Sequence, residues 1–224
     1  MANIDMLEVL ALPKANVVLS NENGVLLEHD NVFFLSNNPG VQDLFLKAIA
    51  DYPPAGNGRL VVARDRAVKE ALEQDYGLKT VMECRHAVYQ KRAPVPYILP
   101  EGAKIIMLDQ SHLDFVHAHY HMVDDVDYIR TRIEDGMFGV LVQGEIAGFV
   151  GTHEERPMGL LEILPEYRRL GLAYALEAHL INHLLSLGRV PFCQVALTNE
   201  PSIQLQQKLG LELSPTVIYW LSQC

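Results

Sequence analysis

Residues 165–173 read PEYRRLGLA, and the fold of the second half of the chain is most readily inferred from this stretch. The apolar run before it, residues 158–164, has the pattern of a strand that Pro165 ends. After it, leucines recur at helical spacing over residues 171–187, and Gly188 stands where a helix would stop. The stretch therefore predicts a strand that turns directly into a long helix.

A turn of this kind is able to hold an anion. The first N–H groups of a helix have no partner within the helix, the helix dipole adds positive charge, and Gly171 lets a phosphate approach the backbone. Arg168 and Arg169 are able to add charge-assisted hydrogen bonds. The simpler alternative is a tight connection with solvated arginines. The stretch is neither the dinucleotide fingerprint nor a P-loop, because G-x-G-x-x-G and G-K-[ST] are absent.

The length of 224 residues permits two domains. Pro94, Pro96 and Pro100 interrupt regular structure, so we expect a boundary there, with domains at 1–98 and 99–224. Both halves alternate strand and helix patterns, which predicts an α/β or α+β fold. Strands are expected at 17–19, 32–35, 59–62, 81–90, 104–108, 137–142, 146–152, 158–164, 192–197 and 216–221. Helices are expected at 41–50, 67–75, 111–121, 125–134, 171–187 and 202–209.

Composition excludes several classes of protein. The net charge is −10 and no cluster of basic residues is present, which argues against nucleic acid as a partner. The three cysteines, Cys84, Cys193 and Cys224, form no C-x-x-C motif, so a reducing cytoplasm is expected. The first twelve residues do not have the pattern of a signal peptide, and no apolar run is long enough to span a membrane.

Two motifs carry a resemblance to a known family. Arg168, Gly171 and Ala173 match the order Q/R-x-x-G-x-G/A, and a second pattern, N-x-x-A-x-x-L-Y-x-K-x-G-F, is met in part further on. The matching positions of the second pattern are Asn199, Ser202, Leu205, Lys208 and Gly210. Residues from about 104 to the end therefore resemble the GNAT acyltransferase superfamily. The run at 164–168 also resembles the glycine N-acyltransferase-like branch, which would make the amino-terminal half a degenerate GNAT-like domain.

The resemblance implies a site for acetyl-CoA or another acyl-CoA. The pyrophosphate would lie against Arg168 and the backbone amides that follow it. Those amides belong to Arg169, Leu170, Gly171, Leu172 and Ala173. Asn199 and Ser202 are further contacts implied by the family, and a backbone N–H at Ile163 or Leu164 would polarise the thioester carbonyl.

The general base is less directly indicated. Family members often carry a carboxylate at the position that Pro157 occupies here, so Glu155 and Glu162 are the preferred candidates. His153 and Glu154 remain alternatives, and without a bulge Glu154 and Glu162 would share one face of a strand. For each carboxylate, a solvated position at a strand end is the plain alternative.

The general acid is a further departure, because Gln206 stands where many family members have a tyrosine. Two functions therefore stay open. One is N-acyl transfer, most simply of an acetyl group, to a primary amine of a small molecule such as an amino acid, by direct attack. The other is a protein that binds or senses acyl-CoA without turnover.

The remaining features predict less. His117 and His121 share a helical face, but no third ligand is evident and no metal site is expected. The family resemblance implies that this helix lines the acceptor side, so that a histidine of this helix or Tyr120 would touch the acceptor. The protein is expected to be a monomer or a homodimer with no membrane partner.

Overall fold

The computed structural model describes residues 1–53 and 59–223. Its contacts divide the chain into two compact units. The first unit consists of Met1–His86, Val195–Glu200 and the stretch from Leu213 onward; the second consists of Ala87–Gln194 and Pro201–Glu212. The units interleave because the last strand, β12 (Ile218–Ser222), pairs with strands of the first unit. Each unit is thus made of segments that are separate in the chain, whereas the sequence predicts a single boundary between residues 98 and 99. That division stays a prediction.

The first unit is a sheet with helices on both faces. Its strand order is β1-β2-β3-β4-β12-β5, and β3 and β4 are the parallel neighbours within it. The strands are β1 (Asn16–Asn21), β2 (Gly24–His29), β3 (Val32–Asn37), β4 (Leu60–Ala63), β5 (Lys79–Val88) and β12. The helices are α1 (Ile4–Val9), α2 (Asp43–Asp51) and α3 (Arg66–Asp75).

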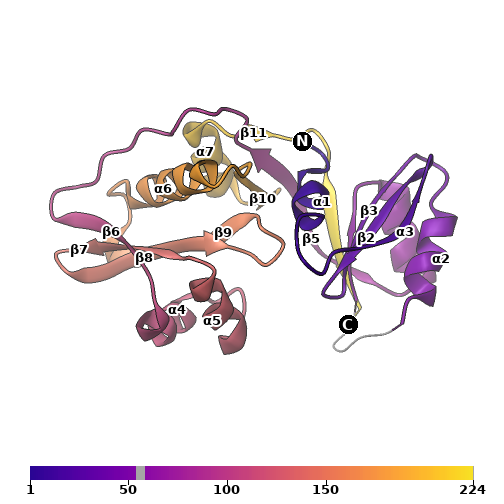
Figure 1. Cartoon of the computed structure of the whole chain (residues 1–224), viewed down its shortest axis with the longest axis horizontal. Helices are drawn as coiled ribbons and strands as arrows, with labels where there is room; N and C mark the ends of the chain where they lie inside the picture. Colours follow the sequence, from indigo (N-terminus) through magenta and orange to yellow (C-terminus); the bar gives the residue numbers. More distant parts are fainter. Residues whose placement is uncertain (54–58, 224) are drawn as a thin grey trace. The chain divides into compact units, whose positions relative to one another are not determined.

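Alternation along β3 builds the two cores of this unit. Phe33 and Leu35 pack with α2 and α3 in one cluster, whereas Val32 and Phe34 pack with α1 in the other. Successive side chains of a strand point to opposite faces, so a fully apolar strand is buried on both sides. Figure 1 shows α1 on one side of the strands and α2 and α3 on the other.

A buried ion pair anchors α1. Asp5 is fully buried and receives two hydrogen bonds from the Arg64 guanidinium, while His86 Nε2 lies 3.5 Å from its carboxylate. Burial raises the pKa of Asp5, but the charges and hydrogen bonds of Arg64 and His86 outweigh it and hold the pKa at about 2. The sequence patterns did not predict α1, because its six residues make fewer than two helical turns and are too short to show a period.

The second unit is a sheet of order β6-β7-β8-β9-β10. Neighbouring strands are antiparallel except β9 and β10, which are parallel. The strands are β6 (Ala103–Met107), β7 (Phe138–Val142), β8 (Glu145–Thr152), β9 (Met158–Ile163) and β10 (Phe192–Ala196). The short β11 (Glu212–Leu213) is outside this order and pairs with β5. The helices are α4 (Leu113–His119), α5 (Val126–Glu134), α6 (Leu172–Ser186) and α7 (Glu200–Leu209), with 3₁₀ turns at Gln110–His112 and Pro165–Tyr167.

Helices cover both faces of this sheet (Figure 1). α6 packs against β7, β8 and β9, and α4 and α5 lie on the opposite face. There Val116, Tyr120 and Ile129 form a buried cluster with Phe149 and Leu160 of the strands. The α/β class with a mixed sheet flanked by helices is therefore confirmed. Among the described residues, no helix is long and apolar enough to cross a membrane.

Candidate functional site

The stretch at 165–173 forms the turn that the sequence predicts. A 3₁₀ turn at Pro165–Tyr167 follows β9, and α6 begins at Leu172. Arg169 and Gly171 have φ of 68° and 81°, so two left-handed residues stand in the last three positions before the helix. Left-handed conformations at a turn aim successive N–H groups into a concavity that suits an anion, and strain of this kind concentrates at functional sites.

Gly171 leaves the start of α6 open. It is the N-cap residue, and no side chain caps the helix. A Cβ built on Gly171 meets no atom of the described chain within 4 Å. The buried side chain of Leu172 anchors the turn, while the small side chain of Ala173 leaves the first turn accessible. The N–H groups of residues 169–173 donate no hydrogen bond to the described residues, which fits a phosphate at the start of this 15-residue helix.

The two arginines of the turn differ in their bonding. Arg168 donates from Nε to the Ile163 carbonyl at 2.9 Å and from its guanidinium to Glu162 Oε1 at 3.1 Å. It thereby ties the turn to the end of β9. Arg169 is exposed and makes no ion pair or hydrogen bond with the residues that the structure describes. Arg169 is therefore the more available of the two cations.

β9 contains a bulge that the sequence did not reveal. The register with β8 shifts between Phe149 and Gly151, whose partners on β9 are Glu162 and Gly159. β9 therefore has one more residue than β8 in this interval, and the buried Leu160, which lies there, has a φ of 47°. A bulge changes which face later side chains occupy. The condition for Glu154 and Glu162 to share a face, an unbroken strand, is therefore not met.

The end of β9 offers one outward backbone amide. β9 pairs with β10 at Met158 and Cys193, where their register is defined, and no further pair follows among the described residues. The Leu164 N–H donates to the Ala147 carbonyl of β8 at 2.9 Å. Because successive N–H groups of a strand alternate in direction, the Ile163 N–H points away from β8. Of the two amides that the sequence proposes, Leu164 is occupied and Ile163 is directed to the open edge.

The charge of each candidate base raises the pKa of a tyrosine in the α4–α5 region. Burial raises the pKa of Tyr120 to about 12, and the charge of Glu162 adds to the effect. Burial also raises the pKa of Tyr128, with the charge of Glu155 as the next cause. Glu155 lies in the turn between β8 and β9, and Glu162 lies near the end of β9. Both carboxylates are thus close to the face of the sheet opposite α6.

A buried tyrosine–histidine pair joins this face. The Tyr128 hydroxyl and His153 Nδ1 are 2.7 Å apart. Burial lowers the pKa of His153 to about 4, with Arg132 adding to the effect, so the imidazole is neutral near pH 7. The ring covers Gly159, where a Cβ would lie 2.2 Å from Nε2. A glycine within a strand often marks close approach of another group, and this signal at Gly159 was present in the sequence.

Gln206 does not reach outward as a tyrosine acid would. Its side chain is 1% exposed, and its Nε2 donates to both carboxylate oxygens of Glu177, at 3.0 and 2.8 Å. Burial raises the pKa of Glu177 to about 7, although the Gln206 amide opposes this rise. Glu177 lies on α6 and Gln206 on α7, and no sequence pattern indicates that they meet.

The remaining predicted residues take the following places. Asn199 precedes α7 and its N–H donates to the Ala196 carbonyl at 3.0 Å, and Ser202 lies in the first turn of α7, half-buried. His117 Nε2 is 3.4 Å from Asp124, and His119 Nδ1 donates to the Phe115 carbonyl at 2.7 Å. His117 and His119 are thus engaged within the α4 region.

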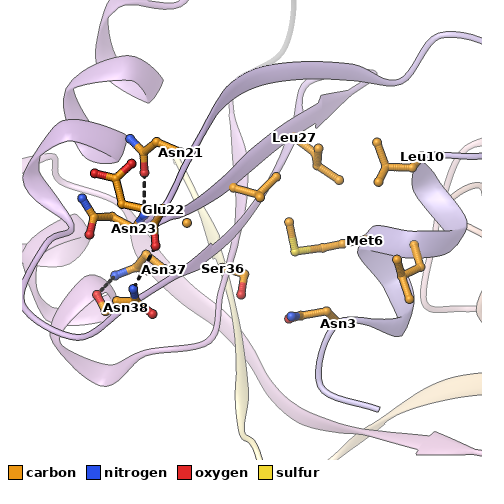
Figure 2. A pocket seen from close by; sticks show the side chains of 13 residues that line it. Asn3, Met6, Leu10, Asn21, Glu22, Asn23, Leu27, Ser36, Asn37 and Asn38 are labelled. Carbon is orange, nitrogen blue, oxygen red and sulfur yellow. Dashed lines mark hydrogen bonds between the residues drawn. The ribbon is translucent and has the colours of Figure 1, made fainter.

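A cavity of about 330 Å³ lies in the first unit, on residues other than these (Figure 2). Met6, Leu10 and Leu27 form its apolar side, and carboxamides such as Asn23 and Asn38 form its polar side. Some of these amides already bond to other residues of the lining: Asn38 donates to the Glu22 carbonyl, and Asn37 donates to the Asn38 carbonyl. No lysine, arginine or histidine is among the described residues that line it. The cavity therefore does not suit a cofactor with several phosphates.

Comparisons with known proteins agree with the architecture. Residues 137–221 match the family model described as FR47-like protein, and this range includes the turn at 165–173. No curated protein matches the chain in sequence.

Three solved structures resemble the chain. A Drosophila protein is 16% identical with a TM-score of 0.76, over 90% of this chain and 74% of its own. A GCN5-related N-acetyltransferase from Kribbella flavida is 13% identical with a TM-score of 0.66, over 99% and 93%. A tandem GNAT protein from the clavulanic acid biosynthesis pathway is 15% identical with a TM-score of 0.55, over 100% and 88%. The fold is therefore that of GNAT acetyltransferases in a two-domain layout.

Proposed function

We propose that the chain is an N-acyltransferase that moves an acyl group, most simply acetyl, from acyl-CoA to a primary amine of a small molecule. The open, uncapped start of α6 at Gly171 carries this proposal. The GNAT fold supports it, as does the FR47-like match over the same segment. The pyrophosphate would bind the amides of residues 169–173, with Arg168 and Arg169 beside them and with Asn199 and Ser202 as further contacts.

The chemistry follows from the end of β9. The Ile163 N–H would donate to the thioester oxygen and stabilise the negative charge that develops there. The acceptor amine would lose a proton to Glu162 or Glu155 and attack the carbonyl carbon, and the C–S bond would then break to release the CoA thiolate. Direct attack is preferred because neither cysteine among the described residues suits the role of nucleophile: Cys84 and Cys193 are both buried, and burial raises the pKa of Cys84 to about 12.

The acceptor is proposed as an amino acid or a similar small amine, and membership of the glycine N-acyltransferase-like branch stays a prediction. The same proposal includes a cytoplasmic location and a monomeric or homodimeric state. It also includes the division into domains at 1–98 and 99–224. A second candidate is a non-catalytic acyl-CoA sensor. The burial of Gln206 against Glu177 favours it, because no hydroxyl acid stands at that position.

The test is to titrate three proteins with acetyl-CoA by calorimetry: the wild type, Gly171→Glu and Gly188→Glu. Gly188 is a matched control: it stands at the other end of α6, has a φ of 71°, and has no atom within 4 Å of an added Cβ. Both variants carry similar backbone strain and the same added charge. We expect Gly171→Glu to lose binding and Gly188→Glu to retain it. Unchanged affinity in Gly171→Glu would refute the pyrophosphate site, and turnover with an amine panel then separates enzyme from sensor.

A further inference from the structure

The cavity of the first unit has an apolar side that is only partly covered. Its volume of about 330 Å³ is at the lower end of the range for pockets that hold small molecules, about 300–1,000 Å³. Met6 and Leu10 of α1 face Leu27 of β2 across it (Figure 2). The Leu10 side chain is 47% exposed, so an occupant would bury apolar surface that water now contacts.

Two polar side chains reach the cavity from different elements. Asn3 directly precedes α1, and Ser36 lies on the α1 face of β3, two residues after Phe34. Figure 2 shows the Asn3 side chain pointing from α1 toward Ser36. Neither side chain makes a hydrogen bond with another residue that the structure describes, and Asn3 does not cap its helix. A carboxamide and a hydroxyl both donate and accept, so together they suit a group that does both.

Arg64 fixes the positions of these two residues. Its guanidinium donates from Nε to the Ala2 carbonyl at 3.1 Å and from Nη1 to the Leu35 carbonyl at 2.9 Å. Ala2 and Leu35 directly precede Asn3 and Ser36 in the chain. The same guanidinium belongs to the buried ion pair that anchors α1. The two walls of the cavity are therefore tied together before a ligand arrives, which lowers the entropic cost of binding.

The charge of the lining restricts the class of ligand. Glu22 is the one ionisable side chain among the described residues that line the cavity, so a carboxylate or a phosphate would find no counter-ion there. An ammonium group only donates, and it would leave the donors of Asn3 and Ser36 unmatched. An amide is neutral, donates through N–H and accepts through C=O at separate atoms, and so suits partners on two walls.

We propose that this cavity binds a small neutral amide that carries a branched apolar group. The amide bonds to Asn3 and Ser36, and the apolar group packs against Met6, Leu10 and Leu27. This site is independent of the proposed acyl-CoA site. A crevice that holds only water is the alternative; it would not distinguish between molecules of one shape and different charge.

The test uses N-acetyl-L-leucinamide as the probe, in the full chain without acyl-CoA. An NMR titration follows the backbone amide signals of Leu10 and Gly24, which line the cavity, and of Leu44 on α2. We expect saturable shifts for Leu10 and Gly24 with a Kd of about 1 mM, and no shift for Leu44. N-acetyl-L-leucine has the same skeleton with a carboxylate, and it should bind roughly tenfold more weakly or not at all.

Two variants test where the probe binds. Leu10→Lys places a charge on the apolar side and should weaken binding by roughly tenfold or more. Leu44→Lys is the matched control, because Leu44 is 52% exposed on a helix of the same unit but does not line the cavity. Asn3→Ala removes the carboxamide and should weaken binding roughly threefold to tenfold. Both leucines are exposed, so we expect all three variants to fold, which thermal unfolding checks.

The outcomes decide both the site and the class of ligand. Unchanged Leu10 and Gly24 signals at roughly tenfold the expected Kd overturn the site. Equal weakening in Leu10→Lys and Leu44→Lys, or full affinity in Asn3→Ala, refutes the proposed contacts. Equal affinity for N-acetyl-L-leucine, or tighter binding of the cationic L-leucinamide, refutes the neutral class. None of these results depends on acetyl-CoA binding, so this inference and the proposed function fail separately.

Discussion

Gln206 and Glu177 join α7 to α6 through a buried amide–carboxyl pair. Nε2 of Gln206 donates to both carboxylate oxygens, but Oε1 of the same amide is buried and has no partner among the described residues. If Glu177 is protonated and the amide is rotated, Oε1 accepts the carboxyl proton and the orphaned acceptor is satisfied. The pair is therefore best satisfied when Glu177 is neutral.

The first prediction concerns Glu177 and stability. Its pKa is about 7 in the folded protein and near 4.5 when unfolded, so the folded state holds the extra proton between these values. Stability from this group is therefore greatest at low pH and is lost as pH rises from about 4.5 to 7, by up to about 3 kcal/mol. Glu177→Gln cannot ionise, so its free energy of unfolding should rise relative to that of the wild type across this window. Urea unfolding at pH 4.5 to 8 measures this; a constant difference would contradict it.

The second prediction has the opposite sign. The pKa of His153 is about 4 in the folded protein, below its usual 6.5, so the unfolded chain takes up the proton first as pH falls. Stability from His153 is present above pH 6.5 and is lost as pH falls toward 4, by about 3 kcal/mol. His153→Gln should remove this dependence. Unfolding curves at pH 4 to 7 test it, with His112→Gln, at a partly exposed histidine, as the control; equal pH slopes for wild type and His153→Gln would count against a buried neutral imidazole.

The third prediction concerns the proposed bases. If Glu162 takes the amine proton, Glu162→Gln should lower kcat by roughly 10²- to 10⁴-fold, with less than about a threefold change in the Kd of acetyl-CoA. The same test applies to Glu155→Gln. Steady-state kinetics with the best amine of a panel, alongside calorimetry, make the comparison; Glu166→Gln, in the exposed 3₁₀ turn, is the control. Full activity in both Glu155→Gln and Glu162→Gln would eliminate these carboxylates as the base.

The fourth prediction concerns the anchor of α1. Asp5→Asn leaves the Arg64 guanidinium buried without its counter-ion, so the free energy of unfolding should fall by about 3–5 kcal/mol. The wild-type pair should persist in acid, because the pKa of Asp5 is about 2. Denaturant unfolding of Asp5→Asn and of the double variant Asp5→Leu/Arg64→Met measures the effect. A loss in the single variant no larger than in the double variant would show that the unpaired charge is not the cause.

Local patterns were enough for much of the architecture. The hairpin of β7 and β8 was predicted from alternation and a turn, and Gln143 and Gly144 do adopt left-handed φ there. The α6 helix and the turn before it were predicted because leucine spacing, Pro165 and Gly171 act within a few residues of one another. Asp125 accepts hydrogen bonds from the first N–H groups of α5, as its position in the sequence indicates.

The sequence by itself therefore determined the α/β class and the position of the candidate phosphate turn. Only the tertiary structure decided that β12 pairs with β4 and β5, that β9 bulges at Leu160, and that Gln206 meets Glu177. The reason is physical. Periodicity and turn chemistry record energies between near neighbours in the chain, whereas strand partners, bulges and buried polar pairs depend on groups that come together only when distant segments pack.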